Sequence, residues 1–265
     1  MKQSAEGAGP DEPAQTSALS REDLLLGGQV RLSQSDRGYR AGMDAALLAA
    51  ACDAGPTDRV LDLGCGPGAV MLAAACRRPR TRFVGIERDP EAVAMIQGNI
   101  VLNGLQDRVQ ALGADIASGF AGLGLDAFDA ALCNPPFFDD PASLRAPSPA
   151  RLGAYMADDG LAAWVGFLLK AVRQGGAVTV IHRADRLGDL LQLLSDKAGS
   201  IRVRPVQPYD DQPAKRVLVR AIKSGKAPLM LLPALILHDR SGAKHTAEAE
   251  AIFRGEAVLD WGQST

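Results

Sequence analysis

Short apolar segments alternate along the chain with longer segments in which apolar residues recur every three or four positions. The first kind is typical of buried strands and the second of amphipathic helices. Strands are predicted at 59–63 ("RVLDL"), 82–87 ("RFVGIE"), 109–113, 128–133 and 177–182. Helices are predicted at 69–76, 90–100, 161–172 and 187–194. This alternation indicates β-α-β units and a largely parallel sheet.

Local signals support individual elements. Asp89 is a good N-cap for the second helix and Pro90 suits its first position. Two last strands, near 201–206 and 216–222, have no helical pattern between them, so we expect them to pair antiparallel. The segment 139–160 contains three prolines and no periodicity, and it is predicted to be a loop beside the active site.

Composition sets outer bounds. With 265 residues, 47% hydrophobic and 23% charged, the chain can form one sizeable α/β domain, or a domain with an extension. The net charge of -2 gives no global nucleic-acid signature, so a polyanion would need a local patch. Four cysteines without a C-x-x-C pair and three histidines without ligand spacing predict reduced thiols in a cytoplasmic protein that binds no metal.

The organisation along the chain follows from these patterns. Residues 1–20 are predicted to be a disordered tail, 21–54 a hairpin and helix extension, 55–225 the main domain and 226–265 a C-terminal extension. The longest apolar run, 228–237, contains a proline and is far shorter than the roughly 20 residues that span a bilayer. No membrane segment is therefore expected.

The stretch "LDLGCGPG" places Gly64, Gly66 and Gly68 at a strand-to-helix turn. Glycines there let a ligand approach the backbone closely, and the helix N-terminus points at it. Because Ala69 follows, the stretch also satisfies the G-x-G-x-x-G/A dinucleotide fingerprint. Glu87, at the end of the next strand, would bind the ribose of a dinucleotide or of another adenosine-containing cofactor. The residues predict an adenosine-containing cofactor; the alternative is a turn that is only structural.

"VLDLGCGPG", "VGIERD" and "GADI" together resemble the class I S-adenosylmethionine-dependent methyltransferases. The resemblance implies an α/β, Rossmann-like fold with a seven-stranded, mostly parallel sheet whose last strand is antiparallel. S-adenosyl-L-methionine would be the cofactor. The residues that the resemblance assigns to the cofactor in these motifs are Asp62, Gly64, Cys65, Gly66, Gly68, Glu87, Arg88, Asp115 and Ile116. Asp115 could instead be a helix N-cap.

The stretch "ALCNPPFFDD" matches the [N/D/S]-P-P-[Y/F/W] motif of the members that methylate exocyclic or amide nitrogens. Asn134, Pro135, Pro136 and Phe137 are therefore the candidate catalytic residues, and Asn134 is also counted with the cofactor residues. The Asn134 side-chain oxygen and the Pro135 carbonyl can accept the two N–H bonds of a flat amino group. Phe137 offers a face to a planar base, with core packing as the alternative for it and for Phe138.

The stretch "GYRAGMDAALLAAAC" together with NPPF is similar to the "methyltransferase small" group. Within it, the bacterial enzymes that methylate N6 of the adenine 3′ of the anticodon in a valine tRNA are most alike. Their G-x-D element implies that Gly42 and Asp44 close the methionine end of the cofactor. Arg40 is counted with these cofactor-binding residues and is expected near the target base. Phe137 stands where adenine enzymes usually have tyrosine.

Three alternatives remain open. A phenylalanine at the fourth motif position also occurs in ribosomal RNA guanine-N2 methyltransferases. Protein glutamine-N5 methyltransferases of the release-factor type share the tetrapeptide but carry an N-terminal helical domain. A nicotinamide-dependent oxidoreductase would use the same glycine turn and leaves NPPF unexplained.

A basic segment favours RNA, and tRNA over rRNA, as the partner. Residues 201–226 hold seven basic and two acidic residues, a balance of +5 in an otherwise acidic chain. Such a patch would follow phosphates while an aromatic ring stacks on an unpaired base. Lys215 and Arg216 are the candidate substrate-binding cations, together with Phe137 and Phe138. A solvated charged face is the alternative.

Overall fold

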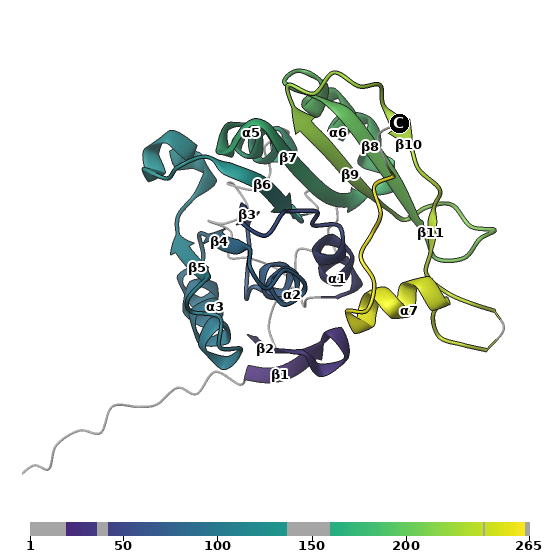
Figure 1. Cartoon of the computed structure of the whole chain (residues 1–265), viewed down its shortest axis with the longest axis horizontal. Coiled ribbons are helices and arrows are strands. Elements are labelled where there is room, and N and C mark those ends of the chain that lie inside the picture. The colour runs from purple at the N-terminus through teal and green to yellow at the C-terminus, as the bar shows by residue number, and fades with distance from the viewer. Residues whose placement is uncertain (1–19, 36–41, 137–159, 241, 263–265) are drawn as a thin grey trace, which may run out of the picture.

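The computed structural model describes residues 20–35, 42–136, 160–240 and 242–262 (Figure 1). A central sheet of nine strands has the order β10-β8-β9-β7-β6-β3-β4-β5, with β11 also paired to β8. Its parallel part consists of β3 (Arg59–Leu63), β4 (Arg82–Glu87), β5 (Val109–Gly113), β6 (Phe128–Cys133) and β7 (Val172–Arg183). The predicted mostly parallel α/β sheet is confirmed.

The two later strands pair as predicted. β9 (Arg216–Lys223) is antiparallel to both β7 and β8 (Ala198–Gln207). The expected count of seven strands was too low, because β10 (Met230–Leu231) and β11 (Leu235–Ile236) add parallel to the outer edge of β8. Each has two residues, which is too short to produce an alternating pattern, and Pro233 separates them.

One predicted strand is longer than the sequence indicated. β7 begins at Val172 rather than at Ala177, because a register shift opposite β6 accommodates the "RQGG" stretch that is typical of a turn. Gly175 has a φ of 75°, a conformation that side chains other than glycine rarely adopt. The irregular start lies at the end of the sheet away from the glycine turn.

Helices cover both faces of the sheet (Figure 1). One face is covered by α1 (Met43–Ala50), α2 (Ala69–Arg77), α3 (Pro90–Leu102) and α7 (Ala247–Arg254). The other is covered by α5 (Gly160–Ala171) and α6 (Leu187–Ser195), with the short 3-10 turns η2 (Ile116–Ser118) and η3 (Phe120–Leu123). Each face therefore has its own apolar core, as expected for a doubly wound sheet.

A hairpin precedes α1. Its strands β1 (Ser20–Leu25) and β2 (Val30–Ser35) flank a short 3-10 turn η1 (Leu26–Gly28), and β1 thus begins at the last residue of the expected tail. Buried Leu32 belongs to the core that contains α1, α2 and α3. The hairpin therefore packs on the helices beside the glycine turn.

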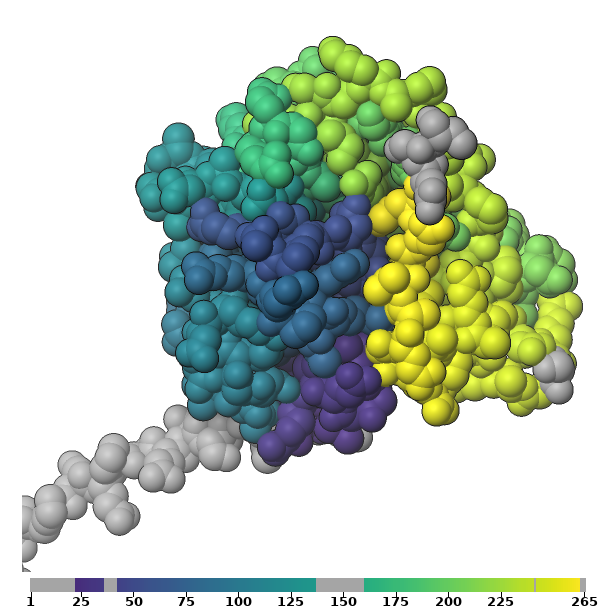
Figure 2. Space-filling model, in the orientation of Figure 1, coloured from purple at the N-terminus to yellow at the C-terminus, as the bar shows by residue number. Residues whose placement is uncertain are grey.

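The last described segment returns to the core. The Leu259 backbone N–H donates to the Ala50 carbonyl at 3.0 Å, and Trp261 Nε1 donates to the Ala51 carbonyl at 2.9 Å. Figure 2 shows the yellow C-terminal residues lying between the blue α1–α2 region and the green outer strands. Residues 247–262 thus cover the end of α1 that lies away from the glycine turn. Among the described residues, no helix is long and apolar enough to cross a membrane.

Candidate active site

The candidate residues gather where the parallel strands end. Leu63 of β3 pairs with Ile86 of β4 and with Cys133 of β6. Gly64, Glu87 and Asn134 follow at or just after these ends, so they lie along one edge of the sheet. β3 has β4 on one side and β6 on the other, so this is the switch point at which open α/β sheets bind ligands.

The glycine turn is shaped by close packing on two sides. A Cβ on Gly64 would lie 2.5 Å from the Trp164 ring, and one on Gly68 would lie 1.8 Å from Ile96 Cδ1. Nothing lies within 4 Å of the corresponding position on Gly66 among the described residues. All three glycines have a positive φ, of 71°, 93° and 52° for Gly64, Gly68 and Gly66. Gly66 therefore leaves space into which a ligand can approach the backbone.

Glu87 connects the glycine turn to the start of α3. Its Oε2 accepts from the Gly66 N–H at 3.0 Å, and its Oε1 accepts from the N–H groups of Arg88 and Asp89 at 2.8 and 2.9 Å. Asp89 caps α3 through a 3.0 Å bond from the Glu91 N–H, as predicted. A carboxylate has about four acceptor positions, so Glu87 retains capacity for a ligand hydroxyl.

Asp62 is a buried carboxylate beneath the same turn, with 1% of its surface exposed. Burial raises the pKa of Asp62 to about 7, the Met71 backbone hydrogen bond opposes this, and the Glu87 charge adds to it. Its Oδ2 has no hydrogen-bond partner among the described residues. A buried acceptor of this kind is costly unless a ligand or water satisfies it.

The adenine-side candidates follow β5. Asp115 Oδ1 accepts from the Ala117 N–H at 2.9 Å, so this residue is the N-cap of η2, which was the structural alternative. Its Oδ2 lies 3.8 Å from the Arg88 guanidinium. Ile116 packs against the core formed with α5 and α6. Asp115, Arg88 and Ile116 are therefore close to the Glu87 end of the site.

The proline motif leaves the sheet directly after β6. Asn134 is half-buried, Pro135 is buried and Pro136 is half-buried. The preceding Cys133 Sγ donates to the Leu63 carbonyl at 3.5 Å, which joins the ends of β6 and β3. This weak contact adds to the pairing of β6 with β3, which places the segment beside the strand that carries the glycine turn. Phe137, Phe138 and Arg40 lie outside the described residues.

Gly42 and Asp44 begin α1, where Gly42 is the N-cap. Asp44 Oδ2 accepts from Arg216 Nε at 2.9 Å, and the Asp44 side chain is 14% exposed. Arg216 starts β9, and exposed Lys215 precedes it. The antiparallel direction of β9 places both basic residues at the same sheet edge as Asn134.

The basic segment 201–226 does not form the single patch that was expected. Arg202 donates to the carbonyls of Trp261 and Gly262, and Arg204 donates to that of Asp260. The remaining cations are also dispersed: Arg220 pairs with Asp53 at 2.5 Å, and Lys223 and Lys226 lie at the opposite sheet edge. Antiparallel strands separate residues that are close in sequence, so only Lys215 and Arg216 remain at the candidate site.

Two residues that support the site were not predicted from the sequence. Trp164 of α5 packs on the Gly64 backbone. Asn99 of α3, 1% exposed, bonds both backbone groups of Ser33 at 2.8 Å and donates to the Pro67 carbonyl at 2.9 Å. A polar residue beside Ile100 on the apolar face of a helix was the available signal for Asn99.

Comparison with known proteins decides the family. Residues 40–146 match the family model described as "Methyltransferase small domain", a range that contains the glycine turn and Asn134. A tRNA1(Val) (adenine(37)-N6)-methyltransferase from Porphyromonas gingivalis is 30% identical over 204 residues, which cover 74% of this chain and 79% of the relative. The chain therefore belongs to the methyltransferase family that includes this P. gingivalis enzyme. The membership inferred from the motifs is confirmed.

Other relatives fit the same assignment. A release factor glutamine methyltransferase from Caulobacter vibrioides is 31% identical to this methyltransferase over 157 residues, covering 56% of this chain and 53% of the relative. The solved structure of a predicted O-methyltransferase from Agrobacterium tumefaciens has a TM-score of 0.68 and 24% identity, and covers 82% of this chain and 98% of that one. The latter similarity shows a shared fold.

This methyltransferase is an N-methyltransferase that uses S-adenosylmethionine. The site fits that cofactor, because it offers the open backbone at Gly66, the acceptor capacity of Glu87 and the unsatisfied buried oxygen of Asp62. Among the described residues, no group of three or more His, Cys, Asp or Glu could hold a metal ion.

Proposed function

We propose that this methyltransferase methylates N6 of the adenine 3′ of the anticodon, position 37, in a valine tRNA. The observation that carries the proposal is the position of the Asn134–Pro136 segment, which starts where β6 ends, beside the glycine turn. The P. gingivalis relative, whose name states this activity, covers most of the chain. tRNA is favoured over rRNA because the relatives that match most of the chain carry that name.

In the proposed mechanism, Asn134 and Pro135 hold the amino group. An exocyclic amine is a weak nucleophile because its lone pair is delocalised into the ring. The Asn134 side-chain oxygen and the Pro135 carbonyl accept its two N–H bonds, which favours a pyramidal nitrogen and stabilises the developing positive charge. When bound, S-adenosylmethionine supplies the activated methyl group. Orientation of the amine provides most of the acceleration. The methylated nitrogen carries a positive charge and readily loses its extra proton to water, so no strong base is needed.

Rigidity of the proline segment supports this role. Pro135 and Pro136 fix their own φ angles, and each restricts the residue before it. The pairing of Cys133 with Leu63 in the sheet fixes the start of the segment relative to the glycine turn. The acceptors are therefore preorganised before the base arrives. In this proposal Phe137 stacks on the base and Phe138 also binds the substrate.

We assign the cofactor residues by their positions. Glu87 accepts bonds from the ribose hydroxyls, while Arg88, Asp115 and Ile116 surround the adenine. At the other end, Gly64, Cys65, Gly66 and Gly68 surround the methionine part, with Asp62 beneath them. Gly42 and Asp44 close this end, and the family resemblance alone adds Arg40 to them. The order of these groups along the sheet edge, from β5 through β4 and β3 to α1, supports the assignment.

RNA is the proposed partner because a single unpaired base of a loop can be extruded into the active site. An unpaired loop base costs less to extrude than a paired one. Lys215 and Arg216 lie at the edge where the base would enter and can contact phosphates that flank it. No membrane or metal partner is part of the proposal.

A second candidate is methylation of a glutamine side chain in a release factor. The match to the C. vibrioides enzyme favours it, and a glutamine amide would present the same two N–H groups to Asn134 and Pro135. The match covers only 53% of that relative. Incubating the purified enzyme with a release factor and with tRNA, each with labelled cofactor, separates the two candidates directly.

The decisive experiment is methylation of a valine tRNA transcript, followed by nucleoside mass spectrometry. We expect N6-methyladenosine in the transcript with adenine at position 37 and none when guanine replaces it. Transfer RNA from cells that lack the gene should lose the same nucleoside. Equal methylation of the guanine-37 transcript, or the disappearance of a methylguanosine in place of methyladenosine, would contradict the proposal.

A further inference from the structure

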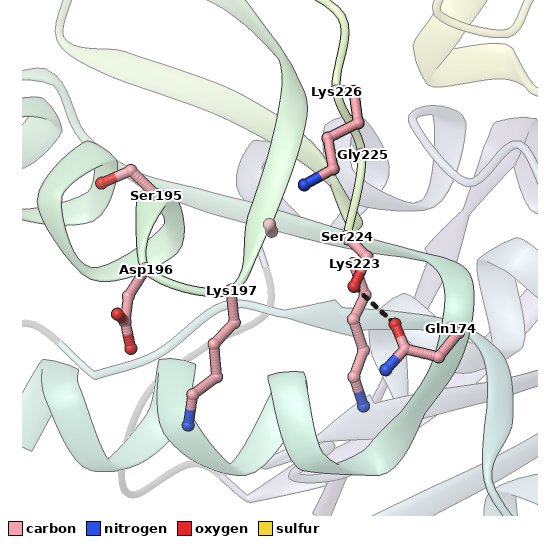
Figure 3. Close-up of a pocket in the computed structure, with 9 residues that line it drawn as sticks. Gln174, Ser195, Asp196, Lys197, Lys223, Ser224, Gly225 and Lys226 are labelled. Carbon is pink, nitrogen blue, oxygen red and sulfur yellow. Dashed lines mark hydrogen bonds between the residues drawn. The ribbon is translucent and has the colours of Figure 1, made fainter.

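A second polar site lies at the other end of the sheet, away from the strand ends that carry Asn134. Because β9 is antiparallel, its first residue Arg216 is near the active site, and its last, Lys223, lies at the far edge. There a pocket of about 370 Å³ opens between the end of α6 and the turn after β9 (Figure 3). Seven residue steps along a strand, at about 3.3 Å each, separate the two ends of β9 by about 23 Å.

The pocket carries excess positive charge. Lys197, Lys223 and Lys226 line it, against the single carboxylate of Asp196. In the part of the chain that the structure describes, none of the three lysines forms an ion pair with a carboxylate. Lys223 Nζ donates to the Val172 carbonyl at 2.7 Å, which fixes its ammonium group and leaves it two further N–H bonds. Figure 3 shows the Lys197 and Lys223 side chains running in the same direction.

The turn after β9, which forms one wall of the pocket, has a strained backbone. Three non-glycine residues in the described ranges have a positive φ; of these, Ser224 (62°) lines the pocket and Ser200 (50°) lies behind it, against Gly225. The Ser224 N–H donates to the Lys197 carbonyl at 2.9 Å, and its hydroxyl donates to Gln174 Oε1 at 2.5 Å. Such conformations persist only where the surroundings hold them, and they concentrate at ligand sites.

Two glycines close the turn against the start of β8. A Cβ on Gly199 would lie 2.3 Å from the Gly225 carbonyl oxygen, and one on Gly225 would lie 2.7 Å from Ser200 Oγ. Backbone therefore packs directly on backbone here, which fixes Lys197 and Lys226 on opposite walls. Figure 3 shows the Lys226 side chain on the other side of the turn from Lys197 and Lys223, whose side chains run away from it.

We propose that this lysine pocket binds backbone phosphates of the RNA substrate, away from the target nucleotide. The inference rests on the proposed RNA methylation. Ammonium groups bind phosphate as point charges, so the lysines that line this pocket suit neighbouring phosphates of one strand rather than a single phosphate. The ~23 Å separation runs through the sheet, so an RNA that contacts both ends must pass over the protein surface, and the contact would be made by phosphates well outside the target loop.

The test uses a double variant, Lys197→Gln with Lys226→Gln, which leaves the structural hydrogen bond of Lys223 in place. The control is Lys244→Gln, an exposed lysine near α7. We expect the double variant to bind full-length tRNA about 10-fold more weakly at low salt. The slope of log affinity against log salt should fall by about 0.7–0.9 for each phosphate that is no longer neutralised. S-adenosylhomocysteine affinity and the thermal unfolding midpoint should stay at wild-type values.

Two further measurements separate the possible explanations. An RNA that contains only the target loop on a minimal stem should bind the wild type and the double variant equally, because it cannot reach the pocket. Unchanged tRNA affinity and salt slope in the double variant would overturn the proposal. If inorganic pyrophosphate binds the wild type but not the variant while tRNA affinity is unchanged, the pocket serves a free phosphorylated molecule instead. A wild type that binds no tRNA would overturn the proposed function itself.

Discussion

Arg216 Nε donates to Asp44 Oδ2 across 2.9 Å, joining residues that are 172 positions apart in the chain. The contact attaches the first turn of α1 to the start of β9 at the edge that carries Asn134. From the sequence, these residues are assigned to different ligands, Asp44 to the cofactor and Arg216 to the RNA. Their pairing means that the position of each depends on the other.

Arg216→Ala should therefore weaken cofactor binding as well as RNA binding. We expect Arg216→Ala and Asp44→Asn each to lower S-adenosylhomocysteine affinity several-fold. The double variant should be little weaker than either single variant, because the interaction is removed only once. Calorimetric titration of the three variants measures this coupling. The control is Arg220→Ala, which breaks the Arg220–Asp53 pair on the same strand. It should alter thermal stability and leave cofactor affinity unchanged; strictly additive losses in the first pair would contradict the prediction.

The glycine turn predicts a graded series of alanine variants. Gly68→Ala places a Cβ 1.8 Å from Ile96 Cδ1 at a φ of 93°, so it should lower the free energy of unfolding by more than about 1 kcal/mol. Gly66→Ala meets no neighbouring atom, although its φ of 52° strains any residue with a side chain, so stability should fall less than in Gly68→Ala. The added methyl group occupies the open side of the turn and should also lower cofactor affinity. Gly98→Ala in the interior of α3 also has space, and it should stabilise by about 0.5–1 kcal/mol.

Urea unfolding and cofactor titration of these three variants test the series. A Gly66→Ala protein that binds S-adenosylhomocysteine as tightly as the wild type would show that the open side of the turn is not the ligand side. Gly98 lies in α3, outside the glycine turn, and serves as the control. If Gly98→Ala lowers stability, a loss in Gly68→Ala could not be attributed to the geometry of the turn.

The sequence predicted the strands that form the site because each is a continuous apolar run bounded by turn residues. β3, β4 and β6 begin and end as predicted. The glycine turn, Glu87 and Asn134 could be located for the same reason, since each lies at or just after the end of a strand. The family motifs then supplied their chemistry.

Other features depend on tertiary contacts and left no local pattern. β10 and β11 exist because the edge of β8 offers hydrogen bonds, and two residues cannot show a period of two. The prediction of one basic patch was wrong because a charge count along the sequence ignores the extended backbone. Arg216 and Lys223 are the two ends of β9 and therefore lie at opposite ends of the sheet. The sequence also gave no sign that Arg202 and Arg204 donate to backbone carbonyls of the C-terminal segment.

Asn134→Ala should abolish turnover while cofactor affinity stays within a few-fold of wild type. The side-chain oxygen is proposed to act on the amine, whereas the backbone of the segment is fixed by its prolines. Asn134→Asp keeps an acceptor at the same place and should retain measurable turnover. Single-turnover rates and S-adenosylhomocysteine titration give the two quantities. Equal losses of rate and affinity in both variants would indicate a structural role.

Trp164 should report cofactor binding by its fluorescence. Its ring packs on the Gly64 backbone, whereas Trp261, the other tryptophan, is bonded to the Ala51 carbonyl behind the C-terminal segment. Adding S-adenosylhomocysteine should change the emission of the wild type and of Trp261→Phe, with the same midpoint as calorimetry. Trp164→Phe should bind the ligand without the emission change. A response that disappears in Trp261→Phe instead would place the ligand elsewhere.

The buried Asp62 predicts how stability without cofactor depends on pH. Burial raises the folded-state pKa of Asp62 to about 7, above its ordinary value near 4. Between these values the folded state binds more protons than the unfolded state, so this contribution is complete below about pH 4 and is lost as pH rises to about 7. The slope attributable to Asp62 approaches about 1.4 kcal/mol per pH unit within that window. Asp62→Asn should remove this part of the slope.

Urea unfolding at pH 5, 6, 7 and 8 in the absence of cofactor measures the effect. Relative to the wild type, the Asp62→Asn protein should gain stability steadily from pH 5 to pH 7 and no further above it. Asp107→Asn changes an exposed carboxylate and should follow the wild-type curve. Saturating S-adenosylhomocysteine should flatten the wild-type slope, because a ligand that satisfies the buried oxygen lowers the cost of its charge. Parallel curves for wild type and Asp62→Asn would show that the carboxyl stays charged in the folded protein.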